Sequence, residues 1–396
     1  MLVLVAPGQG AQAPGFLKPW LDLPGVADRL TWWSAVADLD LIHYGTEADA
    51  ETIRDTAVAQ PLLVAAALAA VGCLFPHPAE GFRLVGAVAG HSVGELAAAA
   101  GAGAITAESA MALVRERGRA MAAAAAVTET SMSAVLGGEP EEVLAKIAQH
   151  GLTPANINGA GQIVAAGTVG QLEAFHADPP VKAKLVKLKV AGAFHTEHMA
   201  PAVERMRQLA KGVPTRDPRM RYLSCRDGQV VHSGPELLDR IVEQVANPVR
   251  WDLCMETMRE LGVTGILEVP PAGTLTGLAK RALPGVETFA LKNPDQLDAA
   301  RAFVDKHGAD AHNQMDESPT WRLLVAPFGG TVKRGPAQVG AELAEGEVVG
   351  AIGSRREEQE LTAEHGGTVL EWLVEDGDPV SPGQPIMRIH PKAQVH

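Results

Sequence analysis

The segment Gly-His-Ser-Val-Gly at 90–94 is the strongest candidate for a reactive site in this chain of 396 residues. An apolar run at 84–89 precedes it, and a helix-forming, alanine-rich run at 95–100 follows it. This pattern predicts a strand, a sharp turn with Ser92 at its apex, and then a helix. Glycines on both sides let the strand and the helix pack closely around a strained serine, and the helix N-terminus points unpaired N–H groups at the same place. The sequence therefore predicts a serine nucleophile for acyl transfer.

A second glycine-rich turn, Gly8-Gln9-Gly10, follows the predicted strand at 2–5. The two glycines allow the backbone N–H of Gln9 to approach a ligand closely. This N–H group and that of Val93 could together form an oxyanion hole for an acyl-transfer reaction. The alternative is an ordinary turn between a strand and a helix, with no ligand.

Arg117 is expected on the buried face of a helix predicted from about residue 106 to 126. Its spacing places it on one apolar stripe with Ala110, Val114 and Met121. A buried guanidinium is costly unless it meets an anion, and its planar fork fits a carboxylate through two parallel hydrogen bonds. The alternatives are an internal salt bridge or a side chain that reaches the surface along its aliphatic stem.

His195 is the candidate general base among the 13 histidines of the chain. It lies between a predicted strand and a predicted helix, in the sequence Gly-Ala-Phe-His at 192–195. A serine needs such a base within hydrogen-bond reach to become nucleophilic near neutral pH. His91 is expected to brace the turn itself, and His198 is expected at the surface.

The elements that position these residues alternate between strands and helices, with one helix predicted at 56–74. This alternation favours an α/β fold with a parallel sheet covered by helices on both faces. Residues 128–190 differ, because two predicted helices lie among three or four predicted strands, which indicates a small α+β insert. The catalytic core is therefore assigned to residues 1–127 and 191–302, and the polar segment 303–320 to a linker.

The C-terminal segment contains an internal repeat. The sequence Gly-Gly-Thr-Val at 329–332 recurs at 366–369, an offset of 37 residues. Short Val, Ile and Leu runs separated by Gly and Pro predict two similar sets of strands. Neither set could bury its apolar face alone. Residues 321–391 are therefore expected to form one all-β sandwich with approximate two-fold symmetry.

Composition limits the classes of function. The net charge of −13 argues against nucleic acid as a general partner. Cys73, Cys225 and Cys254 lie far apart without a Cys-x-x-Cys pair, so neither a disulfide framework nor a metal site is expected, and a cytoplasmic location fits. The apolar N-terminus is too short for a signal peptide, and the longest apolar run, 61–73, is too short to span a membrane.

Six ordered motifs resemble the malonyl-CoA:acyl carrier protein transacylase family, which includes acyltransferase domains of fatty acid and polyketide synthases. The resemblance covers roughly residues 1–300. It implies an α/β-hydrolase-like core with a ferredoxin-like insert, in agreement with the insert expected at 128–190. The matching segments lie at 8–12, 90–95, 117–118, 158–162, 192–195 and 244–251.

The resemblance implies a role for each matching catalytic residue. Ser92 would be the acylated nucleophile and His195 its base. The backbone carbonyl of Gln244 would orient the histidine, so no acidic residue is expected behind it. The backbone N–H groups of Gln9 and Val93 would form the oxyanion hole.

The resemblance also implies the substrates. Arg117 would bind the free carboxylate of the malonyl group of malonyl-CoA, and no cofactor would be needed. His91, Asn158 and Phe194 are expected at the substrate site, and the phenylalanine is typical of members that select malonyl rather than methylmalonyl groups. The acceptor would be the phosphopantetheine thiol of an acyl carrier protein.

The carrier protein is usually acidic in this family, so the resemblance implies a basic docking surface. One candidate is a lysine cluster on and beside a predicted strand, and another is Lys280 with Arg281 at the end of a predicted helix. The alternative is that these are only solvated faces. The cluster consists of Lys182, Lys184, Lys187 and Lys189.

Residues 321–391 resemble a biotinyl/lipoyl attachment domain. Arg356 stands where that domain carries its modified lysine. A guanidinium is not an amine nucleophile, so neither biotin nor lipoate is expected. We interpret the segment as a degenerate domain used for docking to a protein partner, oligomerisation or tethering. A purely stabilising role is the alternative.

Two other functions are kept as alternatives. A serine esterase or thioesterase could use the same turn, but it would need an Asp or Glu to support His195. A non-catalytic acyl-CoA-binding scaffold within a larger assembly would not need Ser92, His195 and Arg117 together.

Overall fold

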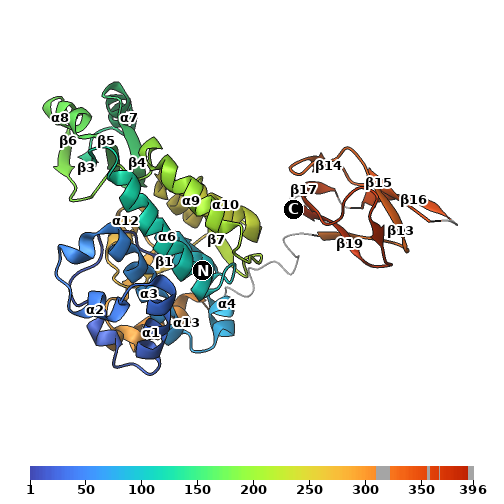
Figure 1. Cartoon of the computed structure of the whole chain (residues 1–396), viewed down its shortest axis with the longest axis horizontal. Coiled ribbons are helices and arrows are strands. Elements are labelled where there is room, and N and C mark those ends of the chain that lie inside the picture. The colour runs from blue at the N-terminus through green and yellow to red at the C-terminus, as the bar shows by residue number, and fades with distance from the viewer. Residues whose placement is uncertain (309–321, 355–356, 365, 391–396) are drawn as a thin grey trace. The chain divides into compact units, whose positions relative to one another are not determined.

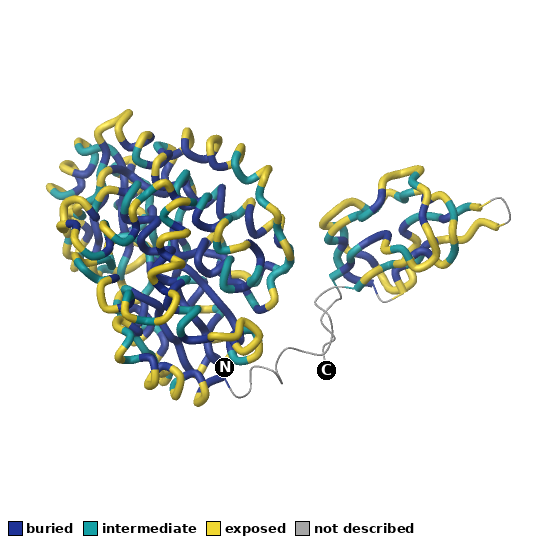
Figure 2. Tube along the Cα trace, turned by 60° about the horizontal axis from the view of Figure 1, so that its bottom comes forward, coloured by how far each residue is buried: buried dark blue, intermediate teal, exposed yellow. Residues whose placement is uncertain are grey.

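The computed structural model describes residues 1–308, 322–354, 357–364 and 366–390 (Figure 1). The chain divides into two compact units, residues 1–314 and 315–396. Buried residues fill the interior of each unit, so each has its own hydrophobic core (Figure 2). The mixed α/β class expected from the sequence is confirmed.

A six-stranded sheet organises the first unit, in the order β11-β10-β1-β2-β7-β8. Neighbouring strands are parallel except for the antiparallel pair β7 and β8. The carboxyl ends of β1, β2 and β7 therefore meet at one edge, which is where open α/β sheets bind ligands. The strands are β1 (Leu2–Ala6), β2 (Ala87–Gly90), β7 (Arg221–Leu223), β8 (Val230–Val231), β10 (Gly265–Glu268) and β11 (Glu287–Ala290).

Helices cover both faces of this sheet. Successive residues of β1 pack into different cores, because Leu2 and Leu4 belong to one apolar cluster and Val3 and Val5 to another. The α-helices are α1 (Val26–Ala37), α2 (Leu41–Thr46), α3 (Thr56–Leu74), α4 (Pro78–Leu84), α5 (Gly94–Gly101), α6 (Ala107–Ala125), α9 (Ala200–Ala210), α10 (Gly234–Gln244), α11 (Trp251–Glu260), α12 (Thr274–Ala282) and α13 (Leu297–Gly308). The 3-10 helices are η1 (Lys18–Trp20), η2 (Thr52–Arg54), η3 (Glu197–Met199) and η4 (Pro294–Gln296).

Helix α3 is the one described helix that is long and apolar enough to cross a membrane by length and composition. Most of its residues are buried against the rest of the first unit. It packs against α1, α5 and α6. Its hydrophobicity is therefore that of a core helix.

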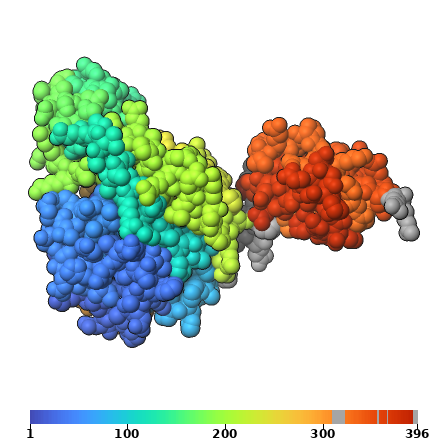
Figure 3. Space-filling model, in the orientation of Figure 1, coloured from blue at the N-terminus to red at the C-terminus, as the bar shows by residue number. Residues whose placement is uncertain are grey.

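A second lobe contains residues 130–187 and forms the green upper part of the first unit in Figure 3. Its strands are ordered β6-β3-β5-β4-β9, with antiparallel neighbours except for the parallel pair β4 and β9. Strand β9 belongs to the core and lies shortly after α10 in the sequence. Its pairing with β4 therefore joins the lobe to this part of the core. The elements are β3 (Thr130–Gly137), α7 (Pro140–Gln149), β4 (Thr153–Gly159), β5 (Gln162–Thr168), α8 (Val169–Ala177), β6 (Ala183–Lys187) and β9 (Val249–Arg250).

Two predicted boundaries are wrong. The linker assigned to 303–320 begins too early, because α13 continues to Gly308. The buried residues Val304 and His307 hold that last part of the helix against the unit, although the segment is polar in composition. The strand predicted at 84–89 begins later, at Ala87, because Leu84 ends helix α4. Residues 309–320 lie outside the described residues.

The second unit contains two four-stranded antiparallel sheets, β12-β19-β17-β14 and β16-β15-β13-β18. Strands related by the 37-residue offset lie in opposite sheets, as β13 and β17 do. Each strand of one sheet therefore has its repeat counterpart in the other sheet. The strands are β12 (Arg322–Val325), β13 (Gly330–Arg334), β14 (Glu342–Leu343), β15 (Glu347–Gly353), β16 (Glu358–Ala363), β17 (Gly367–Trp372), β18 (Pro379–Val380) and β19 (Pro385–His390). Arg356 lies outside the described residues.

Close backbone contacts hold β2 against α5, and they give a first prediction. A Cβ atom on Gly90 would overlap the backbone carbonyl group of Gly94. Gly90→Ala is therefore expected to lower the free energy of unfolding by about 2–4 kcal/mol, measured by urea unfolding. Gly101→Ala, where the added Cβ meets no atom within 4 Å, is the matched control and should change it by less than about 1 kcal/mol. Equal effects in the two variants would contradict this account of the turn.

Candidate active site

Ser92 lies in the turn between β2 and α5, at the carboxyl edge of the central sheet. Its φ of +54° is one that side-chain-bearing residues rarely adopt. The turn is fixed from both sides, because the His91 N–H donates to the Ala6 carbonyl at 2.9 Å and the Gly94 N–H to the His91 carbonyl at 3.0 Å. The structure therefore holds the serine hydroxyl at a strained, partly accessible position above the sheet.

His195 lies beside this serine, with its Nε2 atom 2.7 Å from Ser92 Oγ. Its Nδ1 atom lies 2.8 Å from the backbone carbonyl oxygen of Gln244, the last residue of α10. Because a carbonyl only accepts, Nδ1 carries the proton in this arrangement, and Nε2 is left to accept from the serine hydroxyl. Burial, and secondarily the charge of Arg117, lower the pKa of His195 to about 3. The imidazole is therefore neutral at pH 7 and ready to take a proton.

Arg117 is buried, with 1% of its surface exposed, and its guanidinium faces the same serine. Its Nη2 atom donates to Ser92 Oγ at 3.3 Å and to Gln244 Oε1 at 2.8 Å, and Nη1 donates to Gln60 Oε1 at 2.7 Å. Within the described part of the chain, no carboxylate forms an ion pair with it. Burial lowers the pKa of Arg117 to about 10, against the opposing effect of Glu95, so the side chain stays charged at neutral pH. A buried positive charge with neutral acceptors beside a nucleophile is suited to bind an anionic substrate group.

Close helix packing brings Arg117 to this position. Gly118 follows it on α6, and a Cβ there would lie 2.9 Å from the Thr56 carbonyl oxygen at the start of α3. The absence of a side chain lets α3 and α6 approach, which places Gln60 of α3 against the guanidinium. Val114 and Met121 of α6 are buried with Arg117, as their spacing predicts.

The two candidate oxyanion-hole residues lie in adjacent turns at the same edge. Gly8 packs directly on the nucleophile turn, since a Cβ there would lie 3.0 Å from His91 Nδ1. Among the described residues, neither the Gln9 N–H nor the Val93 N–H has a hydrogen-bond acceptor. Both donors are therefore available to a ligand.

His91 and Asn158 form a pair beside the turn, with His91 Nε2 2.8 Å from Asn158 Oδ1. The His91 ring also meets Trp251 edge-on, with ring centroids 5.7 Å apart. Burial lowers the pKa of His91, so this ring is neutral. The pair connects β4 of the second lobe to the nucleophile turn. Phe194 is buried immediately before His195.

Two polar residues of the site were not singled out from the sequence. Gln60 is a single amide within the apolar helix α3, and Glu95 is a carboxylate in the first turn of the alanine-rich helix α5; each is 1% exposed. A lone polar side chain in an apolar run must find a partner when it is buried. The sequence therefore indicates that each side chain needs a partner, but the partner lies far away in the chain and cannot be identified from neighbouring residues.

Comparison with known proteins finds similar sequences and solved structures. A family model described as "Acyl transferase domain" matches residues 3–303, so the matched region ends before the second unit. The malonyl CoA-acyl carrier protein transacylase of Mycobacterium tuberculosis is 54% identical over 303 residues, which cover 75% of this chain and 98% of that protein. The crystal structure of MCAT from the same organism has a TM-score of 0.74 at 53% identity, covering 76% of this chain and 99% of that one.

A solved complex is also similar. It contains a type II PKS acyl-carrier protein with its malonyl-transacylase, PlMCAT:AntF. The match has a TM-score of 0.70 at 29% identity, and it covers 76% of this chain and 99% of the other.

Proposed function

The chain belongs to the acyl transferase domain family, beside relatives named malonyl CoA-acyl carrier protein transacylase, and we propose that it transfers malonyl groups from malonyl-CoA to the phosphopantetheine thiol of an acyl carrier protein. It is an acyltransferase for fatty acid or polyketide synthesis. One observation carries the choice of a malonyl substrate: the buried guanidinium of Arg117 lies 3.3 Å from Ser92 Oγ, and among the described residues its hydrogen-bond partners are all uncharged.

In the first half of the reaction, Ser92 Oγ attacks the thioester carbonyl of malonyl-CoA while His195 Nε2 takes the hydroxyl proton. The Gln9 and Val93 N–H groups bind the oxyanion. The carbon–sulfur bond then breaks, and the imidazolium returns the proton to the sulfur of the departing CoA. The Gln244 carbonyl stabilises the transient charge on the ring through Nδ1–H, a role that an aspartate has in other serine enzymes.

In the second half, the carrier thiol repeats these steps against malonyl-Ser92. His195 takes the thiol proton, the new thioester forms, and the serine oxygen regains a proton from the ring. Arg117 holds the malonyl carboxylate in both halves, with its fork oriented by the oxygens of Gln60 and Gln244. No cofactor enters this sequence.

The esterase or thioesterase alternative would require a carboxylate behind His195. Nδ1 instead faces a backbone carbonyl. The alternative of a non-catalytic scaffold is opposed by the assembly of nucleophile, base and guanidinium around one point. Intact-mass measurement after mixing the protein with malonyl-CoA alone tests the proposal: one malonyl group per chain should accumulate, and added holo carrier protein should remove it as malonyl-carrier. Release of free malonate instead would favour the hydrolase, and an absence of adduct the scaffold.

We further propose that the carrier protein docks on the lysine cluster of the second lobe. Lys182, Lys184, Lys187 and Lys189 are all exposed, on and beside β6, and the loop that holds His195 follows β6. Lys184→Glu with Lys187→Glu should raise the KM for an acidic carrier about 10-fold and leave malonyl-Ser92 formation unchanged. Lys18→Glu is the control, because Lys18 is also exposed but lies near helix α2, away from the lysine cluster in sequence. An unchanged KM in the double variant would place docking elsewhere, with Lys280 and Arg281 at the end of α12 as the next candidate.

For residues 321–391, we propose a biotinyl/lipoyl-like domain without the modifiable lysine, serving a protein partner. The placement of repeat-related strands in opposite sheets supports this fold.

We also propose a cytoplasmic location, which the three free cysteines support.

A further inference from the structure

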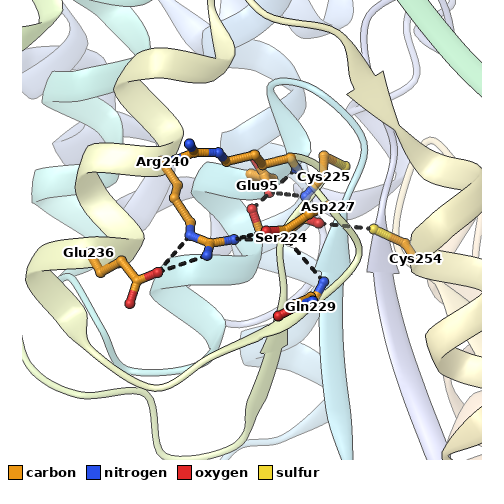
Figure 4. A network of polar contacts seen from close by, with 9 residues as sticks. Glu95, Ser224, Cys225, Asp227, Gln229, Glu236, Arg240 and Cys254 are labelled. Atoms are coloured by element: carbon orange, nitrogen blue, oxygen red, sulfur yellow. Dashed lines mark hydrogen bonds and ion pairs between the residues drawn. The ribbon is translucent and has the colours of Figure 1, made fainter. Parts of the chain in front are cut away.

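Glu95 is a buried carboxylate that the reaction sequence above does not use. It lies in the first turn of α5, three residues after the nucleophile, with 1% of its surface exposed. Its Oε1 atom accepts from the backbone N–H of Cys225 at 2.7 Å, and its Oε2 atom accepts from Gln244 Nε2. Figure 4 shows Glu95 beside Cys225, at one end of a polar network that continues to Arg240. Both carboxylate oxygens are therefore occupied by donors.

Gln244 is the group through which Glu95 reaches the reactive residues. Its Nε2 atom donates to Glu95 Oε2 and to the Ser92 carbonyl, the latter at 3.1 Å. Its Oε1 atom accepts from Arg117 at 2.8 Å, and its backbone carbonyl accepts from His195. One residue thus contacts the nucleophile, the base and the guanidinium.

The chemistry of the amide makes this arrangement directional. A carboxylate can only accept, so Glu95 must face the NH₂ end of Gln244. The oxygen end is then turned towards Arg117, which can only donate. If the amide turned over, an NH₂ group would face the guanidinium and two donors would oppose each other in a buried site.

We propose that Glu95 is a positioning residue for malonyl transfer, which fixes the Gln244 amide so that Arg117 and His195 both stay aligned with Ser92. The inference rests on the proposed function, because Arg117 has a substrate group to align only if that substrate carries a carboxylate.

Titration of Glu95 supplies a readout that a purely structural role would lack. Burial raises the pKa of Glu95 to about 7, against the opposing effects of Cys225, Tyr222, Gln244 and Arg117. Burial also raises the pKa values of Tyr222 and Cys225 well above their usual range, so both stay neutral. Within the described part of the chain, Arg117 on α6 is therefore the charged group that faces Glu95 from the elements packed around it.

Protonation of Glu95 is expected to lower the activity at acid pH. As pH falls through about 7, Glu95 gains a proton and one oxygen becomes a donor, so it no longer holds both partners. Because the pKa of His195 is lowered to about 3, the histidine does not titrate in this range. We therefore expect kcat/KM to fall on the acid side of pH 7, and we assign that fall to Glu95.

The test is Glu95→Gln, which keeps the shape of the side chain. Its amide has only one acceptor oxygen, whereas the Cys225 N–H and Gln244 Nε2 each need an acceptor. We expect kcat/KM for malonyl-CoA to fall about 10- to 100-fold. The remaining activity should no longer decrease as the pH falls through 7. Glu236→Gln is the matched control, because Glu236 belongs to the network of Figure 4 through Arg240 but is exposed. This control should keep the wild-type rate and pH profile.

Wild-type rate and pH profile in Glu95→Gln would overturn the inference. If that variant does not fold, the pH profiles of the wild-type enzyme and of Glu95→Asp test the inference, because both proteins keep a carboxylate at this position. A kcat/KM that stays level through pH 7 in both proteins would also overturn the inference. Failure of the proposed function is distinguishable, because the wild-type protein would then transfer no malonyl group at any pH.

Discussion

Ser92→Ala is expected to lower kcat for malonyl transfer by about 10⁴-fold or more and to abolish the acyl-enzyme. The hydroxyl is the group that forms the covalent bond, and His195 has no other nucleophile within hydrogen-bond reach of Nε2 among the described residues. Removing it leaves the oxyanion donors and the substrate pocket in place, so weak residual catalysis is all that should persist. CoA release with and without carrier protein measures the effect.

The control for this variant is Ser109→Ala, another serine of the first unit, at the start of α6. It should transfer malonyl groups at the wild-type rate. Retention of more than about a tenth of the activity by Ser92→Ala would contradict covalent catalysis at this position.

Arg117→Ala is expected to separate malonyl from acetyl transfer. Loss of the buried guanidinium removes the partner of the malonyl carboxylate, so kcat/KM for malonyl-CoA should fall about 10²- to 10³-fold. Acetyl-CoA has no free carboxylate on its acyl group and needs only the serine, the histidine and the oxyanion donors. Its slower transfer should therefore change by less than about 10-fold. Steady-state rates with both thioesters measure the ratio.

Arg115→Ala is the matched control, since Arg115 lies on the same helix but pairs with Asp38 at the surface. It should leave both rates unchanged. Equal loss of malonyl and acetyl transfer in Arg117→Ala would mean that the arginine has a structural role and does not recognise substrate.

Local patterns predicted the parts of the site that depend on neighbouring residues. The turn at Ser92 follows from glycine spacing, and the burial of Arg117 follows from the period of one helix. Helix α3 has the predicted limits, 56–74, because Asp55 precedes it and caps it through its side chain, and because a long, mostly apolar run follows.

Other parts depend on packing between distant segments. Gln60 meets Arg117 only because Gly118 lets two helices approach, and Glu95 meets Gln244 across 149 residues. The pairing of β4 with β9, which joins the second lobe to the core, leaves no signal in either short segment. The carbonyl of Gln244 was expected only through resemblance to a family, since every residue has a carbonyl and no side-chain pattern distinguishes this one.

The most direct test of the account is a crystal structure of the protein after reaction with malonyl-CoA in the absence of carrier. We expect a malonyl ester on Ser92 Oγ, with its free carboxylate held by both terminal nitrogens of Arg117. A malonyl ester whose carboxylate points into solvent, with the arginine paired to Glu95 and turned away from the serine, would contradict it.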